Sequence, residues 1–260
     1  MKKVVLIAAV VSLLIFETAI PAHAASLFQW SRSRNSVFIL KPGPNLFTFT
    51  FEHPDAELES ELRGPVNPVL VGKKILIDPG HGGANPGALG PGGTTEADNV
   101  LAKSLILAEM LRADGAEVIM TREGAGDVPG PRSVHQLERR VRIAENSGAD
   151  IFVSIHNNTH RNKNIKGTLT FYYSPAKESK LLAEAIQDEL SSQLGSKDLG
   201  TSRRAFYVLR NTSMPSVLVE VGFLTNPEEG LRLADPVYQR QAAEGVYKGI
   251  IRYFEAEARE

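Results

Sequence analysis

The chain has 260 residues, of which 42% are hydrophobic and 23% are charged, close to the averages for soluble globular proteins. Its formal net charge of -1 gives no basic excess, which argues against nucleic acid or an anionic membrane surface as a partner. The absence of cysteine excludes a disulfide framework, a thiol nucleophile, a thiolate zinc ligand and a lipid-modified N-terminal cysteine.

Residues 1–24 have the pattern of an export signal. Lys2 and Lys3 precede the run Val4 to Phe16, in which only Ser12 is polar, and Ala22-His23-Ala24 follows with small residues at the two positions that a signal peptidase reads. This apolar run spans only about 20 Å as a helix, less than the roughly 30 Å hydrocarbon core of a bilayer. We therefore expect cleavage after Ala24 and export to a periplasm or cell wall, with no membrane insertion afterwards. An uncleaved signal anchor is the alternative.

Residues 25–70 are predicted to be an arm or linker with short strands. Val37 to Leu40 and Leu46 to Phe51 are rich in aromatic and β-branched residues, and Pro42-Gly43-Pro44 between them is typical of a turn. A segment of this size rarely forms a core of its own. Pro65 to Pro68 is the expected joint to a main domain at residues 71–256.

Strands and helices alternate through the main domain. In chain order the pattern predicts a strand at Lys74–Ile77, a helix at Asn99–Ala113, a strand at Glu117–Thr121, a helix at Gln136–Asn146, strands at Ile151–Ile155 and Thr168–Tyr173, a helix at Glu178–Leu194, a strand at Ser216–Val221 and a last helix capped by Asp235. Such alternation predicts an α/β fold, with a mostly parallel, six-stranded twisted sheet and helices on both faces.

Two histidines lie where predicted strands end. His81 is in a Pro/Gly-rich turn after Lys74–Ile77, and His156 follows Ile151–Ile155. Ligand sites in open α/β sheets lie at the carboxyl ends of the strands, so parallel strands can bring both imidazoles to one edge of the sheet. That arrangement suits a metal ion. A plain surface histidine is the alternative for His81.

Two glutamates could complete such a site. Glu96 begins a predicted helix after a glycine-rich loop, and as a third ligand it would leave a fourth zinc position for water. A favourable charge at a helix N-terminus would explain Glu96 equally well. Glu220 lies inside an apolar strand, where an unpaired carboxylate is costly to bury. It is either a structural residue paired with arginine or a base that accepts a proton from zinc-bound water.

The order of these motifs matches a known family. The stretch from Val71 to Phe254, about 70% of the chain, resembles the type-3 family of zinc-dependent N-acetylmuramoyl-L-alanine amidases. The matching pieces are IDPGHGG at Ile77–Gly83, Glu96 at the loop-to-helix junction, Leu137-x-x-Arg140-Val-x-Ile-Ala144, SIHNN at Ser154–Asn158 and VEVGFLTN at Val219–Asn226.

The resemblance implies that His81, Glu96 and His156 bind one zinc ion and that Glu220 is the catalytic base. It implies hydrolysis of the amide bond between the lactyl group of N-acetylmuramic acid and the L-alanine of the peptidoglycan stem peptide. Asn157, Asn158 and Arg140 are candidate substrate contacts, and Asp78 is a candidate for orienting the turn or a ligand. His160 is a weaker candidate for a contact at the site.

The sequence departs from the family pattern in three places. Asn85 stands where relatives often have aspartate, Glu96-Ala97-Asp98 replaces Glu-Lys-Asp, and the loop from Arg122 to Leu137 is longer than in many relatives. Division-associated members carry an inserted helix that blocks the zinc until an activator moves it. The short connection between His156 and Thr168 has no room for that helix, so we expect an active site that is open without an activator. We also expect a monomer.

Two other functions remain open at this point. A zinc peptidase that cuts within the stem peptide would use the same residues. A non-catalytic wall-binding module would be expected to have lost a ligand or the glutamate, and this chain keeps all four. A serine hydrolase is disfavoured because the chain has no G-x-S-x-G motif.

Overall fold

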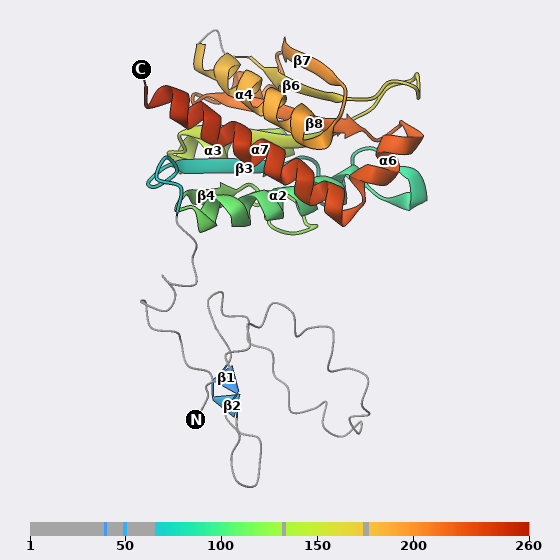
Figure 1. The fold of residues 1–260 in the computed structure, drawn as a ribbon. Coiled ribbons are helices and arrows are strands. Elements are labelled where there is room, and N and C mark those ends of the chain that lie inside the picture. The colour runs from blue at the N-terminus through green and yellow to red at the C-terminus, as the bar shows by residue number, and fades with distance from the viewer. Residues whose placement is uncertain (1–38, 41–48, 51–65, 132–133, 174–176, 260) are drawn as a thin grey trace, which may run out of the picture. The chain divides into compact units, whose positions relative to one another are not determined.

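The computed structural model describes residues 39–40, 49–50, 66–131, 134–173 and 177–259 (Figure 1). The chain divides into two units, residues 1–64 and 65–260. In the first unit, strand β1 (Ile39–Leu40) pairs antiparallel with β2 (Phe49–Thr50), inside the two stretches expected to be strands. The export signal expected at residues 1–24 and the turn expected at residues 42–44 lie outside the described residues.

A six-stranded sheet forms the centre of the second unit, in the order β4-β3-β5-β8-β6-β7. Four neighbouring strands, β4, β3, β5 and β8, run parallel; β6 runs antiparallel to β8, and β7 runs parallel to β6. The predicted mostly parallel sheet is therefore confirmed. The strands are β3 (Lys74–Pro79), β4 (Glu117–Met120), β5 (Ile151–Asn158), β6 (Thr168–Tyr172), β7 (Asp198–Arg203) and β8 (Ser216–Phe223).

Helices cover both faces of this sheet, as predicted. On one face α7 (Pro236–Glu257) lies between α2 (Glu96–Ala113) and α4 (Lys177–Leu194) (Figure 1). On the other face lie α3 (Gln136–Ser147) and the short α5 (Tyr207–Arg210). Successive strand residues serve the two faces in turn. Ile75 and Ile77 pack with the first set of helices, and Leu76 packs with the second.

Several local elements differ from the sequence-based expectation. Helix α2 begins at Glu96 rather than at Asn99, and β5 continues to Asn158, so His156 lies within the strand instead of after it. No sequence pattern predicts β7, because four of its six residues are polar and all six have intermediate or full exposure in the outermost strand of the sheet. The short 3-10 helix η3 (Pro91–Gly93) and helix α6 (Pro227–Leu233) are also outside the expected set.

The strand directions determine which residues can meet. The carboxyl ends of β3, β5 and β8 lie side by side and form one edge of the sheet, across the strand direction. Those of β6 and β7 lie at the opposite ends of the strands. His81, His156 and Glu220 therefore belong to the same edge. Among the described helices, none combines the length and the apolar character that crossing a membrane requires.

Candidate functional site

His81 follows β3 in a turn with unusual backbone geometry. Its φ of 59° is the only positive φ among the described non-glycine residues. Such a conformation is uncommon for a residue with a Cβ and tends to occur at functional sites. The Nδ1 atom of His81 lies 3.1 Å from Oδ1 of Asn85, which leaves Nε2 to face the centre of the site. Asn85 thus orients this imidazole.

Glu96 is presented by the first turn of α2. Thr95 caps this helix, because its side chain accepts a hydrogen bond from the Asp98 amide. The Glu96 carboxylate accepts one bond at Oε1 from the amide of Asn157 and one at Oε2 from the amide of Ala88, each 3.0 Å long. Burial opposes ionisation, but hydrogen bonds from His156 and His81 outweigh it and hold the pKa of Glu96 well below its usual range.

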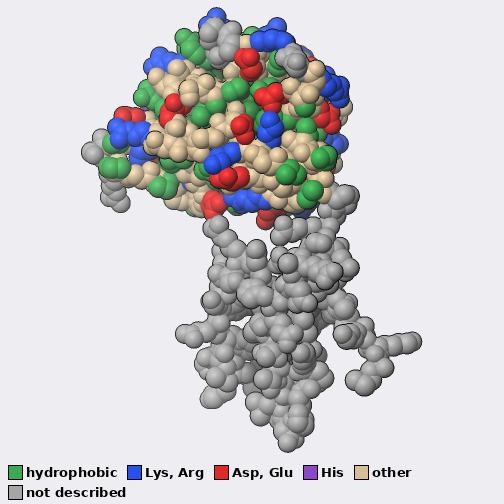
Figure 2. All heavy atoms as spheres, turned by 90° about the vertical axis from the view of Figure 1, so that its left-hand side faces the viewer, with side chains coloured by type: hydrophobic (Ala, Val, Ile, Leu, Met, Phe, Trp, Pro, Cys, Tyr) green, Lys and Arg blue, Asp and Glu red, His purple; other side chains and the backbone are tan. Residues whose placement is uncertain are grey.

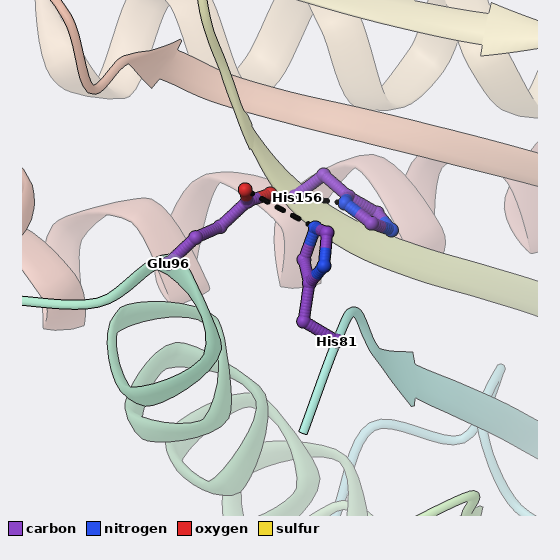
Figure 3. Close-up of side chains that lie close together, drawn as sticks. All are labelled: His81, Glu96 and His156. Carbon is purple, nitrogen blue, oxygen red and sulfur yellow. Dashed lines mark hydrogen bonds and ion pairs between the residues drawn. The ribbon is translucent and has the colours of Figure 1, made fainter. Parts of the chain in front are cut away.

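The three side chains converge from separate elements, as Figure 3 shows. Nε2 of His81 lies 3.1 Å from Oε2 of Glu96, and Nδ1 of His156 lies 3.0 Å from Oε1. The two imidazole rings are 5.0 Å apart between centroids and 74° between planes. One donor atom from each of the three residues lies within 4.8 Å of the other two. The sequence-based grouping of these residues therefore corresponds to one cluster in space.

This cluster could hold a metal ion. Two imidazole nitrogens and one carboxylate oxygen are ligands that zinc accepts, and a set of three protein ligands leaves one position open. The backbone also makes room for them: a Cβ at Gly80 would lie 2.3 Å from Cε1 of His156. The residues present therefore fit a divalent ion of the zinc type.

Glu220 lies beside this cluster on β8. Its Cα pairs in register with that of His156 on the neighbouring parallel strand. The residue is 9% exposed, and its Oε2 has no hydrogen-bond partner among the described residues. Burial raises the pKa of Glu220 to about 8, with a further contribution from the negative charge of Glu96. An arginine partner, the structural alternative, is absent from the described contacts of this carboxylate.

Arg140 occupies a different place from the expected substrate contact. It is only 2% exposed and forms an ion pair with Asp78 beneath the turn that carries His81. Its guanidinium also donates to the carbonyl oxygens of Pro79 and His81. The positive charge of Arg140 holds the pKa of Asp78 below its usual value even though burial opposes this. Both residues therefore support the turn, and Arg140 has little surface to offer a substrate.

The two asparagines after His156 are also placed differently. Asn157 is 3% exposed, and neither polar atom of its side chain has a partner among the described residues. Asn158 is half-buried, and its Oδ1 accepts a hydrogen bond from the amide of Thr159. Of the two, Asn158 is the one with surface near the site. His160 is exposed and donates its amide to Thr225 Oγ1.

No helix covers the connection between β5 and β6. Residues 159–167 are all described, and they form bends, turns and irregular backbone only. The carboxyl-end edge of the sheet is therefore free of a helix from this segment.

Comparison with known proteins shows which family this chain resembles. A family model described as N-acetylmuramoyl-L-alanine amidase matches residues 75–252. A germination-specific N-acetylmuramoyl-L-alanine amidase of Bacillus subtilis is 38% identical over 193 residues, which cover 71% of this chain and 81% of that protein.

Solved structures share the fold as well. The CwlD amidase of Clostridioides difficile, in complex with the GerS lipoprotein, is 36% identical with a TM-score of 0.67, covering 71% of this chain and 99% of that one. The catalytic domain of the amidase CwlV from Bacillus (Paenibacillus) polymyxa is 34% identical with a TM-score of 0.64, covering 70% and 98%.

Proposed function

The chain belongs to the N-acetylmuramoyl-L-alanine amidase family, and on this premise we propose that it cuts peptidoglycan with one zinc ion and with Glu220 as the general base. The ligands would be His81, Glu96 and His156. The bond hydrolysed joins the lactyl group of N-acetylmuramic acid to the L-alanine of the stem peptide. The observation that carries the proposal is the convergence of two imidazoles and a carboxylate within 4.8 Å at a sheet edge that also bears Glu220.

When bound, the ion supplies Lewis-acid chemistry: it lowers the pKa of a water molecule to about 7 and polarises a carbonyl group. Glu220 supplies the proton transfers. Its unpartnered Oε2 accepts a proton from the attacking water and later returns it to the amine nitrogen that leaves with L-alanine. Burial raises the pKa of Glu220 in the metal-free protein, and the positive charge of a bound ion would lower it again, which would leave the carboxylate ionised and able to accept the proton of the water.

The chain's other residues keep the ligands in place. Asn85 accepts the Nδ1 proton of His81 and so holds that imidazole in the tautomer whose Nε2 can bind a metal. Amides from Ala88 and Asn157 hold the Glu96 carboxylate ionised and oriented.

We also propose export of this enzyme and a division of the chain into a signal at residues 1–24, an arm at 25–70 and a catalytic domain at 71–256. The support is the sequence pattern of the first 24 residues together with relatives whose names place them at the cell wall, such as the probable cell wall amidase LytH of Staphylococcus epidermidis, of which this chain spans 65%. Sequencing the N-terminus of the protein secreted by its host would test the cleavage after Ala24.

Digestion of purified peptidoglycan tests the reaction. We expect new L-alanine amino termini and unshortened stem peptides in the mass spectrum, and loss of both release and bound zinc after treatment with a chelator.

Glu220→Gln should keep zinc and fold but lose at least about a hundredfold in rate, because a positioned base contributes about 10² to 10⁴. Shortened stems would indicate a peptidase instead, and a near-normal rate for Glu220→Gln would remove Glu220 from the mechanism.

A further inference from the structure

Arg122, the second residue after β4, is a buried cation without an assigned role. It is 4% exposed, and its four hydrogen bonds to described residues all go to backbone carbonyl oxygens. A buried guanidinium that is not compensated by a directly bonded carboxylate is costly for stability. The cost suggests that the residue serves the geometry of the segments that it binds.

Those segments carry two of the three proposed ligands. Nε of Arg122 donates to Pro79 O at 3.1 Å, and Nη2 donates to Gly80 O at 2.7 Å; both carbonyls belong to the turn that leads into His81. The same Nη2 donates at 2.9 Å to the carbonyl oxygen of Ala97, the residue after Glu96. One nitrogen therefore joins the turn of the first ligand to the helix of the second.

The third ligand depends on the same turn. The backbone of Gly80 faces the ring of His156 so closely that an added Cβ would lie 2.3 Å from Cε1 and 2.5 Å from Nε2. The hydrogen bond from Arg122 to Gly80 O thus fixes the backbone that packs against this imidazole. The turn also wraps the arginine, since a Cβ at Gly82 would lie 2.8 Å from Cδ of Arg122.

We propose that Arg122 is a positioning residue for the metal centre, which sets the spacing of the three ligand-bearing segments. A guanidinium suits this task because its five N–H donors have a fixed planar arrangement. A lysine ammonium at the same place keeps the charge but cannot bond carbonyls in several directions with the same geometry. The proposal rests on the proposed zinc site and concerns how that site is kept in shape.

Simple electrostatics predicts the opposite change in zinc affinity, and this makes the proposal testable. A cation near a divalent ion repels it, so removing the charge of Arg122 would by electrostatics alone strengthen zinc binding. Loss of positioning weakens it, by about 10- to 100-fold for groups that support metal ligands. The direction of the change distinguishes the two effects.

The experiment compares Arg122→Lys, Arg122→Met and the control Arg139→Lys. Arg139 is also buried and also donates to loop carbonyls, those of Val128 and Gly130, but neither lies next to a ligand. Zinc affinity is measured by competition with a chromogenic chelator, and ligand geometry by the visible spectrum of the cobalt(II)-loaded proteins. Arg122→Lys retains the stem and the charge, so it serves even if Arg122→Met does not fold.

We expect Arg122→Lys to bind zinc at least about tenfold more weakly than the wild type and to show an altered cobalt spectrum, with Arg139→Lys unchanged in both. Wild-type zinc affinity or an unaltered spectrum in Arg122→Lys would overturn the proposal, as would an equal loss in Arg139→Lys or tighter binding in a folded Arg122→Met. Failure of the wild type itself to bind zinc would instead overturn the proposed function.

Discussion

Gly80 illustrates how the absence of a side chain can serve a metal site. A Cβ there would overlap the ring of His156, since the three atoms nearest to it all belong to this imidazole. We expect Gly80→Ala to fold and to lose zinc affinity by on the order of 10- to 100-fold, because the displaced ring no longer meets the other two ligands. Isothermal titration with zinc measures this.

The matched control is Gly126→Ala, because a Cβ at Gly126 meets nothing within 4 Å. Zinc affinity of this control should equal that of the wild type. Unchanged affinity in Gly80→Ala would show that His156 is not held by this contact.

Glu220 makes the stability of the zinc-free protein depend on pH. Its pKa in the folded protein, about 8, lies above the ordinary value of 4.5, so the folded state keeps a proton that the unfolded chain has released. The stability contributed by this proton is complete below about pH 4.5 and is lost as the pH rises through about 8. Glu220→Gln has no such proton to lose.

In chelator, therefore, the melting temperature of the wild type should fall relative to that of Glu220→Gln as the pH is raised from about 5 to about 8.5. Scanning calorimetry at several pH values measures the difference. Parallel curves for the two proteins would mean that Glu220 ionises in the folded state as readily as in water.

Single residues of the site were predictable to different degrees. His81, Glu96, His156 and Glu220 stand out because polar residues at strand ends, or inside an apolar strand, conflict with the local pattern. Arg122 gave no such signal, since its role comes from carbonyls that are far apart in sequence. Arg140 matched a family motif, but only the structure shows that its guanidinium forms an ion pair with Asp78 beneath the turn.

The cap of α2 links helix stability to the metal site. Thr95 Oγ1 accepts from the amide of Asp98 and donates to its carboxylate, and the first residue of this helix is Glu96. Thr95→Ala should cost about 1 kcal/mol of stability and should also weaken zinc binding, because fraying of the first turn moves the carboxylate. Thermal unfolding and zinc titration give the two values.

Asp235→Ala is the control for this effect. Asp235 caps α7 by accepting from the amides of Val237 and Tyr238, and α7 carries no proposed ligand. It should lose a similar amount of stability with zinc affinity unchanged. Equal zinc affinity in both variants would separate the cap of α2 from the function of Glu96.

Whole elements followed the sequence where hydrophobic periodicity was strong. The buried strands β5 and β8 and the long helices α2 and α4 lie close to their predicted bounds. Edge strand β7 could not be predicted, because its polar residues show no alternation and its place depends on pairing with β6. The hydrophobic periodicity of α2 does not extend into its first turn, because Glu96 and Asp98 are polar, and only the loop-to-helix junction at Thr95 and Glu96 marks where this helix begins.

The open edge of the molecule predicts how the enzyme is controlled. Residues 159–167 form no helix that could cover the ligands. We therefore expect the purified protein to digest peptidoglycan at its full rate with no other protein added, since the described connection between β5 and β6 contributes no helix that would have to be displaced. Release of stem peptides by the protein alone, and with an extract of its host added, measures this. A relative was solved with a lipoprotein bound, so strong stimulation by the extract is the contrary outcome.

The positions of the two ends of the second unit determine where another segment can be fused. Lys73, just before β3, contacts both Phe254 and Glu257 near the end of α7, so the two ends of this unit lie side by side (Figure 1). They are at the amino end of β3, whereas the proposed ligands lie at the carboxyl ends of the parallel strands. Acidic and basic side chains are interspersed over the face that carries the two ends (Figure 2). An affinity tag, a tether to a solid support or a targeting module can thus be fused at either terminus of this unit. The edge of the sheet that bears the proposed site would still face an insoluble polymer.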